Sequence, residues 1–120
     1  MDINVRAVGN AQVVKLQGGL RLGPPVDAVR SALQELASQG QNRLVLDLSE
    51  VPIVDSTGIG LLVRAHTSAS KNGGAVKLAA PAKIVGQTLK ITGLLQVFEV
   101  FSDAEQAAQS FVAGSQAGAA

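Results

Sequence analysis

An acid, two hydroxyls and two glycines stand together in the heptapeptide VDSTGIG, at residues 54–60, between two apolar stretches. Ser and Asp are favoured N-cap residues of helices because their oxygens accept the first free backbone N–H groups. One interpretation is therefore purely structural. The polar trio Asp55, Ser56 and Thr57 caps a helix, and the glycines let that helix pack closely on a sheet.

A second interpretation uses the same geometry for chemistry. A hydroxyl at a helix N-terminus is exposed, and the N–H donors and positive potential of the helix end favour an anion there. Phosphorylation of Ser56 would add about −1.5 to −2 charges and three acceptor oxygens. Asp55 would oppose the added charge, and a docking partner would meet a very different surface without any change of fold. Spacing alone leans towards the helix cap.

A catalytic interpretation needs more groups than the sequence offers. Asp47, in a predicted strand, could join Asp55 as a carboxylate pair, and an enzyme or nucleotide hydrolase would use both with Ser56. No base for Ser56 is evident, and no cluster of acids surrounds it. His66, the single histidine, lies near the apolar stripe of a predicted helix, where a structural role is the usual one.

Metal and cofactor sites are equally poorly supported. The chain has no cysteine and one histidine, which excludes thiol chemistry and the usual zinc ligand sets. Its glycines match neither a Walker A loop nor a dinucleotide-binding fingerprint. We therefore expect no catalytic residues, no metal and no cofactor. An enzyme should show a closed pocket with converging polar groups, whereas a switch should expose Ser56 on a flat or convex surface with an apolar rim.

Composition indicates one globular domain with an aliphatic core. The 120 residues are 47% hydrophobic and 16% charged, with three Phe and no Trp or Tyr. The net charge is +1, and the scattered basic residues form no patch with stacking aromatics, which disfavours nucleic-acid binding. No stretch approaches the ~20 apolar residues that span a membrane, and no signal peptide is visible. We expect a cytoplasmic protein.

Hydrophobic periodicity predicts the elements that must position the VDSTGIG segment. Strands are expected at residues 3–8, 11–17, 43–48, 75–80 and 96–101. Amphipathic helices are expected from Pro25 to a stop at Gly40, from Thr57 to Lys71, from Pro81 to near Gly93, and after a Ser102–Glu105 capping box. The order ββαβαβαβα predicts an α/β fold with a mixed, mostly parallel sheet of about five strands and four helices. We expect a single domain over residues 1–113 and a disordered tail over 114–120.

The apolar faces of these helices should pack on the sheet. The residues expected on them are Val26, Val29, Leu33, Leu36, Ala37, Ile59, Leu62, Val63, His66, Ile84, Val85, Thr88, Leu89, Ile91, Ala104, Ala107, Ala108, Phe111 and Val112.

The run LVLDLSEVPIVDSTGIGLLVRA resembles the STAS domain of bacterial anti-sigma factor antagonists. Members of that family carry Asp-Ser-[Ser/Thr]-Gly-[Leu/Ile]-Gly after a strand of the form [Val/Leu]-Leu-Asp-Leu. Further landmarks of the family follow in the right order: GGLRLG, KNGGAVKLA, LKITGLLQVF and SDAEQAAQSF. The resemblance covers about residues 3 to 112.

The resemblance implies a phosphorylation switch. Ser56 matches the serine that an anti-sigma factor with serine kinase activity phosphorylates, and Thr57 is a second candidate acceptor. The unphosphorylated domain would bind the anti-sigma factor and free the sigma factor, phosphorylation would release the domain, and a serine phosphatase would reset it. ATP and magnesium belong to the kinase. The implied partner surface consists of Asp55, Ser56, Thr57, Gly58, Ile59, Gly60 and Arg21.

Arg21 is a departure from the family pattern. Many members have Gly-Glu-Leu-Asp where this chain has Gly18-Gly19-Leu20-Arg21. If that loop lies beside the switch, Arg21 could pair with a phosphate on Ser56, or it could alter which kinase docks. An alternative function also stays open. The domain could be a scaffold subunit of a stress-sensing or transporter-associated complex that is never phosphorylated.

Overall fold

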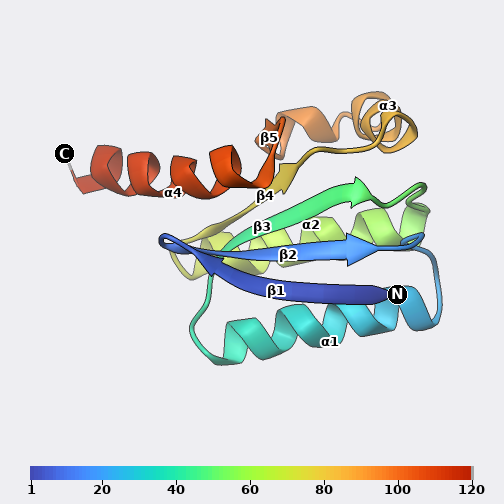
Figure 1. Ribbon diagram of the computed structural model, residues 1–120, viewed down its shortest axis with the longest axis horizontal. Helices are drawn as coiled ribbons and strands as arrows, with labels where there is room; N and C mark the ends of the chain where they lie inside the picture. Colours follow the sequence, from blue (N-terminus) through green and yellow to red (C-terminus); the bar gives the residue numbers. More distant parts are fainter. Residues whose placement is uncertain (120) are drawn as a thin grey trace.

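Five strands form one mixed sheet in the computed structural model, which describes residues 1–119 of the chain and side chains as far as residue 111 (Figure 1). The strands are β1 Asp2–Val8, β2 Ala11–Gln17, β3 Arg43–Glu50, β4 Ala75–Ala79 and β5 Val100–Phe101. They lie side by side in sequence order. β1 is antiparallel to β2, and every later pair is parallel.

Four α-helices and one 3₁₀ turn connect and cover the strands. They are α1 Pro24–Ser38, α2 Ser56–Lys71, α3 Lys83–Ile91, the 3₁₀ turn η1 Leu94–Gln96, and α4 Ala104–Ala119. The predicted order and fold class are confirmed. The boundary expected at residue 113 falls inside α4, in a part whose side chains lie outside the described residues.

Local sequence explains where α1 and α2 begin and end. Two prolines occupy the first turn of α1, where the missing N–H costs nothing. Gly40, at φ +77°, ends that helix in a left-handed conformation while the N–H of Gln41 donates to the carbonyl of Leu36 at 2.9 Å. At the end of α2, Lys71 lies in the last turn, where its charge suits the helix dipole.

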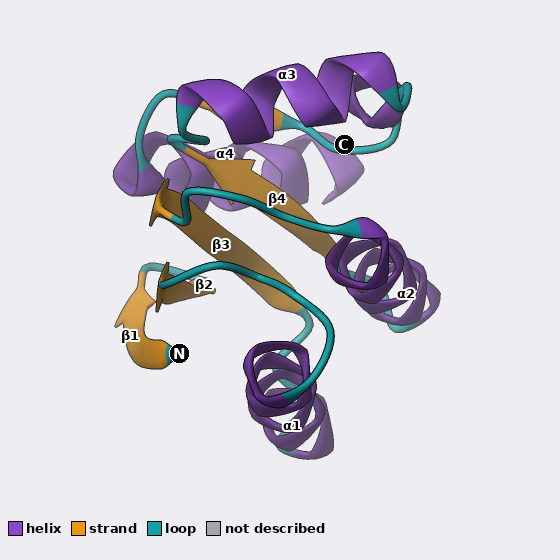
Figure 2. Ribbon diagram, turned by 90° about the vertical axis from the view of Figure 1, so that its right-hand side faces the viewer, coloured by secondary structure: helices purple, strands orange, loops and turns teal. Residues whose placement is uncertain are grey.

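The helices lie in two layers, one on each face of the sheet (Figure 2). α1 and α2 cover one face, and α3 closes the same core cluster with Val85 and Leu89. α4 covers the opposite face by itself, in contact with β2, β3 and β4. β3 is buried on both faces, as its continuous apolar run predicts.

Some predicted core residues lie elsewhere. Ile84 and Ile91 of α3 are 58% and 84% exposed, so that helix buries a narrower stripe than its apolar content suggests. Ala37 is also exposed. In α2, Leu61 is buried beside Leu62 although the predicted stripe omitted it. Val112 lies outside the residues whose side chains are described.

The fifth strand is much shorter than predicted. Only Val100 and Phe101 pair with β4, because η1 follows α3 directly and turns the chain. Phe98 is buried and packs on the ring of His66, with centroids 5.2 Å apart. The segment QVFEVF is predicted to be a strand because apolar and polar residues alternate in it. In the structure only its last two residues form a strand, and Phe98 anchors the segment in the core.

The start of α4 also differs from the expected capping box. The carboxylate of Asp103 accepts from the N–H of Gln106 at 2.8 Å and caps the helix. The hydroxyl of Ser102 instead contacts the Gln106 side chain. The capping residue is therefore Asp103 and not Ser102, which the S-x-x-E pattern predicts, and the helix begins at Ala104.

Across the described residues, no helix combines the length and the apolar character that crossing a bilayer would require.

Candidate functional site

Two loops run side by side at the carboxyl end of the sheet, where β2 leads into α1 and β3 leads into α2 (Figure 1). Leu20 and Val54 form a parallel bridge between the loops. The N–H of Leu20 donates to Ile53 at 2.9 Å, and the N–H of Asp55 donates back to Leu20 at 3.1 Å. The backbone thus holds GGLRLG against VDSTGIG, and Arg21 and Ser56 belong to one surface.

Asp55 is the N-cap of α2. Its Oδ1 accepts from the N–H of Gly58 and its Oδ2 from the N–H of Leu22, both at 2.8 Å. These two backbone donors hold the pKa of the Asp55 carboxyl below its ordinary value, with a smaller contribution from the charge of Arg21. One carboxylate therefore caps the helix and fastens the neighbouring loop to it.

Ser56 is the first residue of α2 and its side chain is exposed. The cap position belongs to Asp55, so the interpretation of Ser56 as a capping serine is wrong. The hydroxyl instead stands in the first turn, where the helix dipole is positive. Thr57 follows with a half-buried side chain, which makes its hydroxyl the less accessible of the pair.

The two glycines of the segment play different roles. Gly58 is buried, and a Cβ atom there would lie 2.6 Å from the carbonyl oxygen of Leu20 and 2.8 Å from Cγ1 of Val54. Only glycine allows the helix to approach the loop so closely. A Cβ on Gly60 would meet only the Arg64 guanidinium, at 3.5 Å. Between them, Ile59 is half-buried and packs against the core.

Two apolar side chains are exposed on the loops that meet next to Ser56. Leu22 is 73% exposed and Ile53 is 37% exposed, one on each of the two loops that meet at Asp55. Sequence reasoning missed both. Leu22 carried a signal, since an unpartnered leucine in a Gly- and Pro-rich loop has no core to enter. The two loops therefore expose apolar surface beside the segment that carries Ser56.

Asp47 and His66, the other residues considered for chemistry, do not join Asp55 and Ser56 in one site. Asp47 alternates with Leu46 and Leu48, so it lies on the face of the sheet opposite α2, and it accepts from the N–H of Ser49 at 3.0 Å. It forms no pair with Asp55. The Nδ1 atom of His66 accepts from the backbone N–H of Val76 at 3.1 Å, which ties α2 to β4. His66 is therefore structural.

Residues that could hold a metal ion do not gather anywhere in the described part of the chain. A recess lies between α1 and α2, and its lining does not include Ser56, Asp47 or Asp55. The arrangement at the loops therefore offers an exposed hydroxyl on a rigid, partly apolar surface. Ser56 lines neither this recess nor the smaller one around Gly40 and Gly73.

Comparison with known proteins agrees with this architecture. A family model described as the STAS domain matches residues 2–107. The anti-sigma-B factor antagonist of Bacillus subtilis is 32% identical over 110 residues, which cover 91% of this chain and 98% of that protein. A Thermotoga neapolitana protein, named as a homolog of the candidate antagonist TM1081, is 32% identical over 73 residues. That match spans 61% of this chain and 65% of the relative.

Solved structures show the same fold. SpoIIAA of Bacillus, described as an anti-sigma factor antagonist, is similar in its unphosphorylated form with a TM-score of 0.76 at 20% identity, covering 94% of this chain and 97% of that one. Its phosphorylated form gives a TM-score of 0.73 at 19% identity, covering 92% and 99%. With the match over nearly all of the sheet and its helices, the chain belongs to the STAS domain family.

Proposed function

We propose that this protein is an anti-sigma factor antagonist whose surface around Ser56 binds an anti-sigma factor and is switched by phosphorylation of that serine. The observation that carries the proposal is the position of Ser56. Its hydroxyl is exposed in the first turn of α2 while Asp55 already supplies the cap. A kinase can reach the hydroxyl, and modifying it leaves the cap intact.

The surroundings of Ser56 explain how a phosphate would act on a partner. The group adds about −1.5 to −2 charges beside two exposed apolar side chains, Leu22 and Ile53. A partner that packs on those side chains would have to desolvate the phosphate, which is costly without a matched cation. Asp55 adds a like charge next to it. Phosphorylation would therefore release the partner without reshaping the domain.

Arg21 places a positive charge in the loop beside Asp55, where many family members have an acid. Its charge already acts on Asp55 across the loop contact. A phosphate on Ser56 would draw the same guanidinium, because arginine pairs well with phosphate oxygens. Arg21 would then stabilise the phosphorylated form and also help to select the kinase that docks on this loop.

The partners follow from this cycle. The anti-sigma factor would itself be the serine kinase and would supply ATP and magnesium, and a serine phosphatase would reset the domain. The chain itself would perform no catalysis. The cycle would take place in the cytoplasm, where sigma factors act. The related protein SpoIIAA is described in both an unphosphorylated and a phosphorylated form, which supports a phosphorylation cycle for the present protein.

The decisive experiment offers the protein to the anti-sigma kinases of its host with ATP and maps the modified residue by mass spectrometry. We expect one phosphate on Ser56 and none in the Ser56→Ala variant. The Thr57→Ala variant is the matched control and should still be phosphorylated. Transfer to Thr57 alone, or binding without phosphorylation at either hydroxyl, would overturn the assignment of Ser56.

Binding measurements then test the switch. Ser56→Ala should bind the anti-sigma factor as tightly as the unmodified protein, and Ser56→Asp should bind at least about tenfold more weakly, a difference of about 1.4 kcal/mol. Equal binding of both variants would show that Ser56 is not the switch. A domain that binds its partner and is never phosphorylated would instead be the scaffold subunit considered above.

A further inference from the structure

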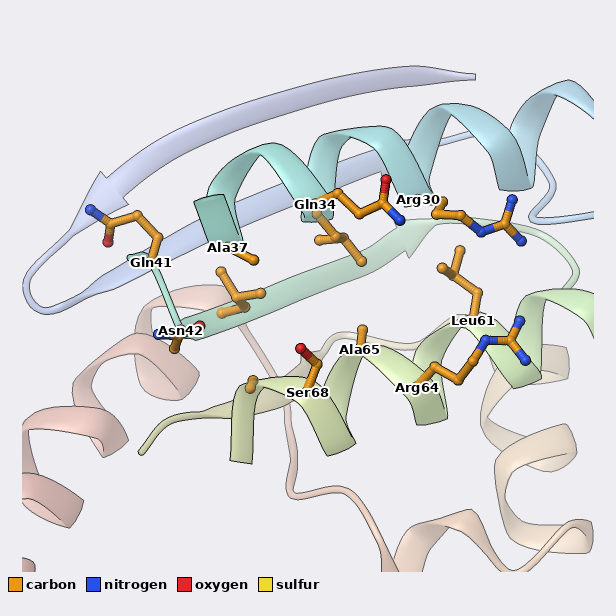
Figure 3. Close-up of a pocket in the computed structure, with 12 residues that line it drawn as sticks. Arg30, Gln34, Ala37, Gln41, Asn42, Leu61, Arg64, Ala65 and Ser68 are labelled. Carbon is orange, nitrogen blue, oxygen red and sulfur yellow. The ribbon is translucent and has the colours of Figure 1, made fainter. Parts of the chain in front are cut away.

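An open recess of about 230 Å³ lies between α1 and α2, away from the residues that carry the proposed function (Figure 3). Its floor is apolar, formed by Leu33, Leu44 and Leu61. Small side chains leave it open. Ala37 on α1 lies across the recess from Ala65 and Ser68 on α2, and Gln34 is a larger side chain on the α1 side. Ala37, which is exposed to solvent, forms part of the α1 side of the recess.

Both ends of the recess are polar, but they differ in charge. At one end the guanidinium groups of Arg30 and Arg64 lie on facing helices, with Leu61 between them (Figure 3). At the other end lie the uncharged residues Gln41 and Asn42. The recess therefore has a cationic end and an uncharged end, joined by an apolar floor.

The cationic end is not fully neutralised by the protein. Arg30 pairs with Asp27 at 3.0 Å. Among the described side chains, the ion pairs include none to Arg64. The Arg64 guanidinium instead lies back over Gly60, and glycine at that position leaves it room along the helix. Two guanidinium groups against one carboxylate leave an excess of positive charge at the end of an apolar groove.

We propose that this recess binds a small amphipathic anion, with a carboxylate held between Arg64 and Arg30 and an aliphatic chain lying over Leu33, Leu44 and Leu61. Guanidinium groups match carboxylate geometry and give charge-assisted hydrogen bonds. The apolar floor rewards burial of methylene groups at roughly 0.8 kcal/mol each. The volume of about 230 Å³ is smaller than that of a typical ligand pocket, which favours a medium-chain carboxylate over a nucleotide-sized ligand.

The proposal is independent of phosphorylation, because none of these side chains touches Ser56. It concerns the same helix, however. Leu61 and Arg64 lie near the middle of α2, whose first residue is Ser56. A ligand in the recess would therefore contact the element that presents the serine.

Octanoate is the probe that tests this inference directly, titrated into the whole protein while backbone amide shifts are followed by NMR. We expect saturable shifts at Leu61, Ala65, Ser68 and Ala37. Acetate, which has the charge without the chain, and octanol, which has the chain without the charge, should each bind at least about tenfold more weakly. Arg64→Gln should weaken octanoate binding about tenfold, whereas Lys90→Gln, a loss of one positive charge on the distant helix α3, should leave it unchanged.

A second variant separates the recess from general surface charge. Ala65→Leu should fill the hollow and abolish octanoate binding while the spectrum of the folded protein is kept. If Ala65→Leu unfolds the protein, Ala37→Leu fills the same hollow from the exposed side of α1. Shifts scattered over the exposed apolar residues of α3, equal binding of octanol and octanoate, or no saturation by about 10 mM would overturn the proposal.

Discussion

The two faces of the sheet are built from different side chains. Under α1, α2 and α3 the buried cluster consists mainly of Leu and Val, including Leu46, Leu62 and Leu78. Under α4 it consists mainly of Ala, with Phe111 and the valines of β2 and β3. The first face buries long branched side chains, and the second lets a helix approach the strands closely through small ones.

The difference affects how firmly the residues around Ser56 are held. α2 rests on large interlocking side chains and is fixed at its start by Asp55 and Gly58, so Ser56 is held in one position. On the other face, the buried lysine Lys77 donates to the Ser110 hydroxyl at 2.7 Å and lies 4.2 Å from the centre of the Phe111 ring. α4 is thus held partly by polar contacts.

The largest expected effect tests the contrast in the cores. Leu62→Ala removes a fully buried side chain beneath α2 and should lower the free energy of unfolding by about 2–5 kcal/mol. Ala107→Gly, in the fully buried centre of the α4 face, should cost about 1 kcal/mol, because it removes one methyl group and some helix propensity. Urea unfolding followed by circular dichroism measures both. Equal losses of unfolding free energy would mean that the two faces of the sheet contribute equally to stability.

The next effect tests whether α2 is fixed at its first turn. Gly58→Ala forces a methyl group against the backbone of Leu20 and should cost about 1–3 kcal/mol. The matched control is Gly60→Ala, two residues along the helix, where the new methyl group has room and helix propensity favours Ala by about 1 kcal/mol. Thermal unfolding of the two variants should shift in opposite directions. A neutral Gly58→Ala would show that the loop contact is loose.

A smaller effect is expected from the charge on the α4 face. Lys77→Met keeps the long stem against Phe111 and removes the ammonium group, and should change stability by no more than about 1 kcal/mol. The Ser110 hydroxyl still donates to the carbonyl of Ala107, at 2.6 Å, so no buried polar group is left unpaired. Urea unfolding of this variant tests the point. A loss well beyond that range would show that Lys77 is the main anchor of α4.

The smallest effect depends on pH and concerns the two helix caps. Because the folded-state pKa of Asp55 is below its ordinary value, its stabilising contribution is fully present above that ordinary value and is lost as the pH falls through the folded-state pKa. Asp55→Asn removes the charge and one of the two hydrogen bonds. The stability difference from the unmodified protein should therefore be largest near neutral pH and shrink in acid.

The cap of α4 supplies the control for that measurement. Asp103 accepts from one backbone N–H, that of Gln106, and Asn caps a helix about as well. Urea unfolding over a series of pH values measures both variants. At neutral pH it should show a smaller loss for Asp103→Asn than for Asp55→Asn, because Asn can keep the single hydrogen bond that Asp103 accepts. If Asp55→Asn behaves in the same way, the loop contact through Leu22 is not held by the charge of Asp55.

The elements around the candidate site could be predicted because each carries strong local signals. The apolar run RLVLDL, the Gly-Pro-Pro start of α1 and the Asn-Gly-Gly end of α2 all act within a few residues. Single-residue burial was harder to predict. Ala37, Ile84 and Ile91 have apolar character at helical spacing, but their exposure depends on where neighbouring helices stop.

The contacts that define the site could not be read from the sequence. Asp55, Ser56 and Thr57 are all capable of capping a helix, and the choice of Asp55 follows from the second bond to Leu22, which lies 33 residues earlier in the chain. The same contact brings Arg21 to the surface. Likewise, the short β5 results from η1, which forms because Phe98 is drawn into the core against His66.

The sequential order of the strands affects how the protein is made. Every strand joins the edge left by the strand before it, so each new segment meets its partner already synthesised. β1 and β2 pair as a local hairpin, whereas each later strand pairs in parallel across a helical connection, which slows folding. The loops around Ser56 need only β1 to α2 for their contacts. These loops can therefore assemble while α4 is still being translated.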